Sequence, residues 1–361
     1  MSANGIRPFN RISLLVTESC NLRCDYCFEP SRSLKSMSWE TGKKAIDFLL
    51  QNSKTKTNFM SFFGGEPLMK FELIRRLTDY AIERFAREGK TIGFSITTNG
   101  LLLRKKVLDF ARTHAWSFVL SIDGNRETHD KHRHFKTGQG SYDLLTENLP
   151  MILEYYPNVP ARASIHPDTC AQFAENMHHL LALGFNAVAP YPVYEATWST
   201  DELDTFKKEF TMFGDYWLER KRLKQPFRFW TLEIFLRDLT PDSNAPFHPY
   251  LHHCYAAKDS IHVNTAGEVF PCHRFNAYCD KFNDREKYCL GLIGQPLDQA
   301  KIEAIHDLYL KLLNNSDSCS AFCPAHNYNS YGTIQMNDQT TRVFYKMFRA
   351  IADDFRDKLI S

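Results

Sequence analysis

The sequence predicts an α/β fold, a partial (β/α)6 TIM-like barrel followed by a small cysteine-rich C-terminal domain. Between residues 11 and 192, short apolar runs alternate with longer amphipathic stretches, which is typical of βαβ units around a parallel sheet. There are six such units rather than the eight of a closed barrel, so we expect an open one. After Pro246 the chain changes to short strands, turns and cysteines.

The six predicted strands are short apolar runs, and five helix-like segments lie between them. The strands are Ile12–Val16, Phe59–Phe63, Ile92–Ile96, Phe118–Ile122, Ala161–Ile165 and Ala187–Pro190. The helices are Ser38–Gln51, Glu72–Glu88, Leu103–Thr113, Tyr142–Tyr155 and Ala171–Leu183. Ser38 is suited to cap the first helix, with Glu40 in its first turn.

The rest of the chain predicts a connector and a second domain. Residues 198–245 are rich in aromatic and charged side chains and are expected to be mainly helical, and a final amphipathic helix is expected near Thr341–Lys358. We therefore predict a barrel over residues 1–197, a helical connector over 198–245, and a second domain over 246–361.

Composition excludes several classes of protein. The 44 basic and 42 acidic side chains give a net charge of +2 without a long charged run, which argues against a nucleic-acid or charged-membrane partner. There is no signal-peptide pattern and no apolar stretch approaching the ~20 residues of a membrane span, so we expect a cytoplasmic protein. Disulfides are rare in the cytosol, so the ten cysteines indicate metal binding.

Three of these cysteines form a tight group after the first predicted strand. Cys20, Cys24 and Cys27 are separated by three and two residues, and thiolates suit iron–sulfur clusters or zinc. A closed zinc site needs four ligands, whereas a cubane bound by three thiolates leaves one iron open to a cofactor. The alternative is a zinc loop that takes a distant fourth ligand.

Polar and glycine-containing motifs follow the next three strands. They are Gly64-Gly65-Glu66-Pro67, Thr98-Asn99-Gly100 and Asp123-Gly124. The carboxyl ends of parallel strands meet at one edge of a sheet, where reactive groups gather in such folds. Taken singly, the glycine pair and Asn99-Gly100 could each be an ordinary turn.

Together these motifs resemble the radical S-adenosylmethionine superfamily over most of residues 11–192. Cys20-x3-Cys24-x2-Cys27, with the aromatic Tyr26, is similar to the loop that binds that family's [4Fe–4S] cluster. The resemblance implies that Gly64, Gly65, Glu66 and Pro67 contact the amino group of S-adenosylmethionine.

The same resemblance extends to the later strands. It assigns Asn99 to the third-strand motif and Ser121 to the fourth-strand motif near the ribose, and it extends through His129-Asp130, Arg133 and Gly140-Ser141. Arg162 matches an arginine that meets the cofactor carboxylate, although on a strand it could equally form a surface ion pair.

A second cysteine group lies in the last third of the chain. Residues 261–270 read as a hairpin turning at Thr265–Gly267, which would bring Cys254 and Cys272 together. Cys319 and Cys323 add two thiolates, enough for one four-ligand cluster or for a structural zinc site.

This region resembles the SPASM or shorter twitch extension of radical enzymes that act on peptides and proteins. A complete SPASM motif has two further cysteines shortly before the pair and another after it, but here Asn314, Asn315 and Asp317 stand nearby and no cysteine follows Cys323. The resemblance therefore implies one auxiliary cluster, of the [4Fe–4S] type, rather than two.

The remaining cysteines and nearby histidines are expected to be structural. We predict buried thiols at Cys279 and Cys289, on a further hairpin, with ligation of a cluster as the alternative, and a structural role for Cys170 at the start of a helix. Four histidines flank the expected ligands and are read as ordinary polar residues rather than ligands. They are His252, His253, His273 and His326.

The resemblance implies a maturase that cleaves S-adenosylmethionine reductively and abstracts hydrogen from a ribosomally made peptide. The outcome could be a thioether, a crosslink, an epimerised centre or an excision, and no catalytic acid, base or relay residue can be named. The alternatives are a maturase that makes formylglycine in sulfatases and a non-catalytic iron–sulfur electron carrier. Only 19 residues precede Cys20, so we expect a separate leader-peptide-binding protein, besides a low-potential donor of the flavodoxin or ferredoxin type.

Overall fold

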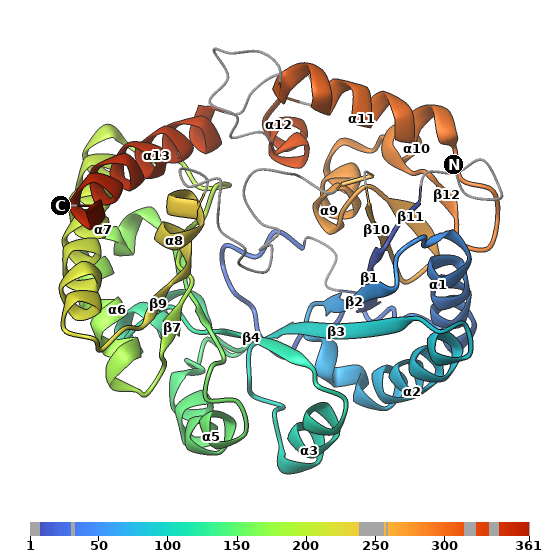
Figure 1. The fold of residues 1–361 in the computed structure, drawn as a ribbon, viewed down its shortest axis with the longest axis horizontal. Helices are drawn as coiled ribbons and strands as arrows, with labels where there is room; N and C mark the ends of the chain where they lie inside the picture. The colour runs from blue at the N-terminus through green and yellow to red at the C-terminus, as the bar shows by residue number, and fades with distance from the viewer. Residues whose placement is uncertain are drawn as a thin grey trace.

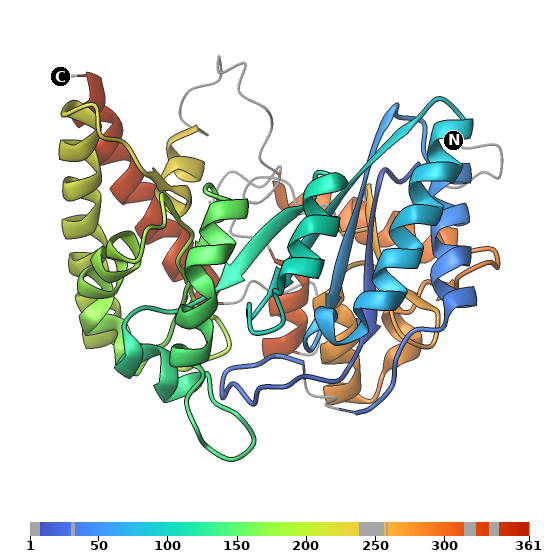
Figure 2. The same ribbon diagram turned by 90° about the horizontal axis from the view of Figure 1, so that it is seen from below.

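The computed structural model describes residues 8–29, 33–237, 256–257, 259–313, 323–331 and 339–360. In this part of the chain, helices form an outer layer around an arc of strands (Figure 1). Seen from the side, α7 and α13 lie together at one end of the molecule, and α1 and α2 at the other (Figure 2).

One sheet carries ten strands in the order β12-β11-β10-β1-β2-β3-β4-β5-β7-β9. The strands from β10 to β9 in that order pair in parallel, whereas β11 and β12 are antiparallel. The ten strands are β1 (Arg11–Thr17), β2 (Thr57–Gly64), β3 (Thr91–Thr98), β4 (Ser117–Ser121), β5 (Ala161–Arg162), β7 (Ala187–Val188), β9 (Arg228–Phe229), β10 (Ser260–Val263), β11 (Glu268–Phe270) and β12 (Gly291–Leu292). A separate parallel pair joins β6 (Ser164–Ile165) and β8 (Tyr191–Pro192).

Helices follow the strands of the barrel as the sequence pattern predicts. Those of the barrel are α1 (Trp39–Asn52), α2 (Phe71–Arg87), α3 (Lys105–Thr113), α4 (Arg126–His132), α5 (Tyr142–Tyr155) and α6 (Phe173–Ala182), with the 3-10 helices η1 (Pro67–Lys70) and η2 (Pro167–Gln172). Ser38 caps α1 by accepting a hydrogen bond from the Thr41 N–H. In the described residues the two ends of the sheet do not pair with each other, so the prediction of an α/β partial barrel is confirmed.

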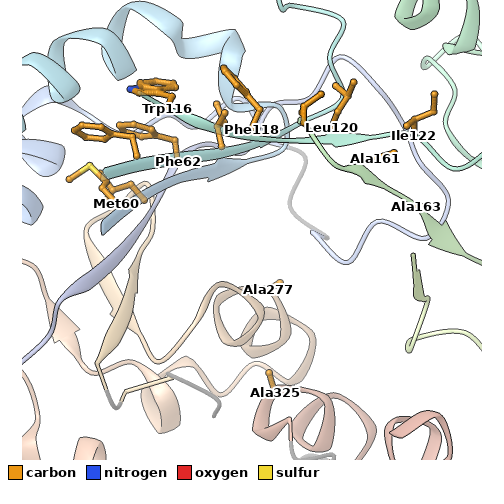
Figure 3. Close-up of a cluster of buried hydrophobic side chains, with 14 of the residues drawn as sticks. Met60, Phe62, Trp116, Phe118, Leu120, Ile122, Ala161, Ala163, Ala277 and Ala325 are labelled. Carbon is orange, nitrogen blue, oxygen red and sulfur yellow. The ribbon is translucent and has the colours of Figure 1, made fainter. Parts of the chain in front are cut away.

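Apolar side chains on one face of the strands form the core. Figure 3 shows Met60 and Phe62 of β2 on the same side as Trp116 and Phe118. The rings of Phe62 and Trp116 lie 5.4 Å apart, and Phe110 of α3 lies 5.7 Å from Trp116. This face therefore packs beneath the outer helices, which holds the barrel strands in register.

A row of serines lies on the opposite face of the same strands. Ser13, Ser61 and Ser95 stand in register across β1, β2 and β3, and all three are only half-buried. Because successive side chains of a strand point to opposite faces, these hydroxyls line the inside of the arc. The same face carries the apolar Leu15 and Phe63, so the inner surface offers both hydroxyls and apolar contacts.

The C-terminal part of the chain continues the barrel sheet. The predicted hairpin is confirmed, because β10 and β11 are antiparallel with His262 opposite Phe270. β10 also pairs in parallel with β1, with Ser13 opposite His262. The domain boundaries at residues 197 and 246 stay a prediction.

The further hairpin expected around Cys279 and Cys289 is wrong. Cys279 lies inside α9 (His273–Phe282), and Cys289 follows the short α10 (Arg285–Tyr288). Phe275, Tyr278, Cys279 and Phe282 recur at helical spacing and give α9 an apolar face.

The connector and the final helix agree with the prediction over the described residues. α7 (Thr200–Arg222) and α8 (Trp230–Arg237) make residues 198–237 mainly helical, with β9 between them. α13 (Gln339–Ile360) packs on both of these helices. The remaining helices are α11 (Gln299–Leu313) and α12 (Pro324–Tyr331). No helix in the described ranges has the length and apolar character needed to cross a membrane.

Candidate functional site

Cys20, Cys24 and Cys27 lie on the loop that follows β1. Burial is the main reason that the pKa of the Cys20 thiol rises to about 12, and the neighbouring Cys24 and Cys27 thiols contribute. Cys27 is exposed, while Cys20 and Cys24 are half-buried. Because a buried thiol ionises readily only beside a cation, this donor set fits one soft metal centre.

The end of β2 lies against this loop because residue 65 is glycine. A Cβ on Gly65 would stand 2.5 Å from the Ser19 carbonyl oxygen and 2.9 Å from the Cβ of Cys20. The Gly65 N–H donates to the Thr17 carbonyl at 3.1 Å, and the Glu66 N–H donates to that of Ser19 at 2.9 Å. The absence of a side chain at Gly65 therefore sets how closely Cys20 approaches the strand.

Gly64 and Pro67, on either side of Gly65 and Glu66, also allow the end of β2 to pack against the cysteine loop. A Cβ on Gly64 would stand 2.4 Å from the Thr17 carbonyl oxygen, so this position is also closed to larger residues. Pro67 begins η1, where its missing N–H is not needed.

Glu66 is a buried carboxylate at the carboxyl end of the sheet, 1% exposed. Its Oε1 accepts from the Leu68 N–H at 3.0 Å and from the Thr98 hydroxyl at 2.9 Å, and its Oε2 accepts from the Asn99 N–H at 2.9 Å. Burial raises the pKa of Glu66 to about 7, against the opposite effect of these three donors. Since a carboxylate oxygen accepts two hydrogen bonds, Oε2 keeps one position for another donor.

Asn99 connects the end of β3 to the cysteine loop. Its Nδ2 donates at 2.8 Å to the Oδ1 of Asn21, the residue that follows Cys20 in the chain. Its Oδ1 accepts from the Leu101 N–H at 3.1 Å. The side chain is therefore held in one orientation beside the three cysteines.

Ser121 and Arg162 stand opposite each other at the ends of β4 and β5. Ser121 is buried, and the Arg162 guanidinium lies 4.4 Å over the ring of Tyr191 and donates to the Ala163 carbonyl at 2.5 Å. Burial lowers the pKa of Arg162. No carboxylate in the described residues forms an ion pair with it, so the surface ion pair left open above is not formed and the guanidinium is suited to an anionic ligand.

A buried network around Asp123 orients the cysteine loop, and sequence reasoning did not find it. Asp123 accepts from Arg133 Nε at 2.8 Å, from the Ser164 N–H at 2.8 Å and from the hydroxyl of Tyr26, which stands between Cys24 and Cys27. Burial opposes ionisation of Asp123, but the Arg133 charge outweighs it and lowers the pKa of the carboxyl. Tyr26 and Arg133 were both noticed in the motifs, but no spacing rule predicts that they meet.

Two of the four predicted C-terminal ligands come together. Cys272 precedes α9 and Cys323 precedes α12, and these helices pack against each other. Burial raises the pKa of the Cys272 thiol to about 11, and the nearby Cys323 thiol raises it further. The other two predicted ligands, Cys254 and Cys319, lie outside the described residues.

The other described cysteines lie at ordinary structural positions. Cys279 is fully buried in α9 and Cys170 is buried in η2. The thiol of Cys289 donates to the Gly291 carbonyl at 3.5 Å and is half-buried rather than buried.

Side chains between the two cysteine regions link them. The Arg274 guanidinium lies 4.5 Å over the ring of Phe28, which follows Cys27, and it pairs with Glu195 and with the Tyr278 hydroxyl. Next to it, the ring of His273 lies 5.5 Å from that of Phe28. Arg274 and Glu195 belong to no motif, so sequence reasoning could not single them out.

Comparison with known proteins gives a family match over the barrel. Residues 14–180 match the model of the "Radical SAM superfamily". The chain is 29% identical over 264 residues to an uncharacterized protein of Methanocaldococcus jannaschii, covering 72% of this chain and 83% of that protein.

Several curated relatives carry named activities, among them a sulfatase-maturating enzyme and a cyclopropyl synthase. A serine-type anaerobic sulfatase-maturating enzyme of Bacteroides thetaiotaomicron is 31% identical, but the match covers 38% of this chain and 34% of that protein. The radical SAM cyclopropyl synthase TigE of Paramaledivibacter caminithermalis is 22% identical over 93% of this chain and 72% of its own.

Solved structures share the fold over nearly the whole chain. Native anSMEcpe with bound AdoMet matches with a TM-score of 0.78 and 18% identity, covering 97% of this chain and 98% of that one. Streptococcus suis SuiB bound to precursor peptide SuiA matches with a TM-score of 0.58 and 15% identity, covering 92% and 76%. At these identities the likeness establishes the fold.

Proposed function

We propose that this chain, whose residues 14–180 match the radical SAM superfamily, is a maturase that modifies a ribosomally made peptide. The observation that carries the proposal is the junction of the three-cysteine loop with Gly65 and Glu66, which leaves three thiols beside an incompletely occupied carboxylate. This arrangement combines a place for a cluster with a place for an amino group.

The residues present fit the family's cofactors. Cys20, Cys24 and Cys27 would hold the [4Fe–4S] cluster and leave one iron without a cysteine ligand, where S-adenosylmethionine would bind. When bound, these groups supply reductive cleavage to a 5′-deoxyadenosyl radical, which abstracts hydrogen from the substrate.

The chain's own residues bind and orient the small molecule. Glu66 Oε2 would accept from its ammonium, and the Arg162 guanidinium would bind its carboxylate. Asn99 and Ser121 would face the sugar and base from the ends of β3 and β4. The Tyr26–Asp123–Arg133 network would keep the loop in place while these contacts form.

A polar substrate suits the inside of the arc. The half-buried hydroxyls of Ser13, Ser61 and Ser95 can exchange hydrogen bonds with a peptide backbone. Cys272 and Cys323, with Cys254 and Cys319, would hold one auxiliary cluster. Four thiolates would close that cluster, which favours acceptance of an electron over direct binding of substrate.

Anaerobic incubation of the reconstituted enzyme with dithionite, S-adenosylmethionine and candidate precursor peptides tests the proposal. We expect release of 5′-deoxyadenosine and methionine, together with a mass change in one peptide. Cys24→Ala should abolish both, because the open-iron geometry needs all three thiolates, whereas Cys170→Ala should keep both. Cleavage of the cofactor by Cys24→Ala would refute the site.

Formation of formylglycine is the second candidate, favoured by the 31% identity to a serine-type sulfatase-maturating enzyme. Sulfatase-derived peptides that carry serine or cysteine at the target position test it. Conversion of serine would remove two hydrogens and create an aldehyde that a hydrazine probe captures. Modification of these peptides, with none of the precursor peptides changed, would select this candidate.

The remaining partners stay proposals. A low-potential flavodoxin or ferredoxin would supply electrons, and a separate leader-binding protein would present the peptide. The cytoplasm, where such donors and reduced thiols are found, is the compartment that fits this chemistry.

A further inference from the structure

A cluster of two imidazoles and one carboxylate lies beside the cysteine loop and belongs to none of the motifs above. His132 ends α4, and His166 and Asp168 flank Pro167 at the start of η2. One ligand atom of each of these three residues lies within 4.8 Å of the other two.

The three donor atoms converge on one point. Asp168 Oδ1 is 2.9 Å from His132 Nε2 and 2.7 Å from His166 Nδ1, and the two imidazole rings are 4.5 Å apart. The Lys131 ammonium lies 2.9 Å from the other oxygen, Oδ2, so Oδ1 is the oxygen that faces the histidines.

His132 has carboxylates on both sides. Its Nε2 faces Asp168, and its Nδ1 lies 3.4 Å from Asp25 Oδ2. A metal ion bound at Nε2 would leave Nδ1 to donate to Asp25, in the arrangement common to metal-bound histidines.

The exposure of the cluster also fits an ion with free coordination positions. The His132 side chain is 9% exposed, whereas those of His166 and Asp168 are 28% and 40% exposed. Two histidines and one carboxylate on one side of an ion, with the other side open to water, form a site that first-row divalent metals favour.

We propose that His132, His166 and Asp168 form a mononuclear site for a divalent transition-metal ion, separate from the iron–sulfur clusters. The site joins α4, η2 and, through Asp25, the loop that carries Cys24. Asp25 also accepts from His134 Nε2 at 3.0 Å, so two histidines already attach this residue to the segment after α4. An ion bound here would link the cysteine loop, through Asp25, to α4 and η2.

Equilibrium dialysis of the anaerobic, cluster-loaded enzyme against zinc at a buffered free concentration tests the proposal. Elemental analysis then gives zinc and iron per chain. His166→Ala and Asp168→Asn should each bind one zinc ion fewer than the wild type, with iron unchanged. His114→Ala is the matched control, because His114 also faces one carboxylate, Asp79 at 3.7 Å, at a similar 23% side-chain exposure but without a third donor.

Zinc K-edge absorption separates this site from zinc bound by thiolates. The zinc ion lost in the variants should have nitrogen and oxygen neighbours and no sulfur. Asp168→Asn keeps the shape of the side chain, so a fold-neutral variant is available if His166→Ala is unstable. Zinc contents equal to the wild type in Asp168→Asn, or a missing ion with sulfur neighbours, would overturn the assignment. Neither result depends on turnover, so the peptide-modifying activity is tested separately.

Discussion

At the scale of single residues, Glu66 is a buried carboxylate with one acceptor position left on Oε2. Its oxygens accept hydrogen bonds from donors in both η1 and the end of β3. Burial leaves its pKa at about 7, so the site changes charge close to neutral pH. A cationic group bound at Oε2 would favour the ionised form.

The first prediction concerns the pH dependence of cofactor binding. Below the Glu66 pKa of about 7, the ammonium must displace a proton, so the affinity for S-adenosylmethionine should fall with decreasing pH, by at most about tenfold per pH unit. In Glu66→Gln the affinity should be lower and this pH dependence lost. Anaerobic calorimetry at pH values above and below that pKa measures the affinity for S-adenosylmethionine. An equal pH dependence in the wild type and in Glu66→Gln would contradict the role of Glu66 as acceptor of the ammonium.

The second prediction concerns Arg162, whose guanidinium has no carboxylate partner in the described residues. Arg162→Gln should weaken S-adenosylmethionine binding about 10- to 100-fold, the equivalent of a charge-assisted hydrogen bond of about 1.5–3 kcal/mol. Iron content should not change. Arg228→Gln, which removes an exposed arginine paired with Glu233, is the control. Unchanged affinity in Arg162→Gln would show that another group binds the carboxylate.

At the scale of elements, the junction of β2 with the cysteine loop depends on contact distance. The strand end and the loop are joined by backbone hydrogen bonds that form only because Gly65 has no Cβ. On the other side, Tyr26 and Asp25 attach the loop to the segment around α4. The loop is therefore held from two directions, as a three-ligand cluster site requires.

The third prediction tests this junction. Gly65→Ala should lower the iron content by one cluster, because its Cβ would meet the Ser19 carbonyl at 2.5 Å and displace Cys20. Gly89→Ala is the control: it has a φ of +64° but nothing within 4 Å of a Cβ, so it should cost only about 1 kcal/mol of stability. Iron analysis and chemical denaturation measure the two effects. Full iron content in Gly65→Ala would contradict the account.

The fourth prediction concerns the element pair α9 and α12. Cys272→Ala should remove one cluster, leaving about four of ~8 iron atoms per chain. Cleavage of S-adenosylmethionine should remain measurable, while modification of the peptide stops. Iron analysis measures the loss of the cluster, and quantification of 5′-deoxyadenosine and of modified peptide measures the two reactions. Complete loss of cleavage would mean that the C-terminal cluster supplies electrons to the first, or that it stabilises the whole fold.

At the scale of the whole molecule, the sequence predicted the features that local patterns encode, namely the barrel strands and the cap of the first helix. Apolar runs such as Ile12–Val16 and Phe59–Phe63 fall within β1 and β2, and Ser38 caps α1 as expected. The motifs that follow the first four strands could be expected to lie together, because the carboxyl ends of parallel strands meet at one edge of a sheet.

The remaining features depend on contacts between residues distant in the chain. No periodicity indicates that β10 pairs with β1, or that Arg133 reaches Asp123 and Tyr26. The helix around Cys279 was missed because closely spaced cysteines and turn residues outweighed the helical spacing of Phe275, Tyr278 and Phe282. Arg274 and His132 gain their significance only from their neighbours in space.

The electron paramagnetic resonance spectrum of the dithionite-reduced enzyme, recorded with and without S-adenosylmethionine, tests the central claim most directly. In Cys272→Ala, where the signal comes from the N-terminal cluster alone, the cofactor should shift the spectrum, because it binds the iron that carries no cysteine. Cys24→Ala should show no such shift. A spectrum unchanged by the cofactor, or a metal centre without any signal after reduction, would contradict a cluster with an open iron in this loop.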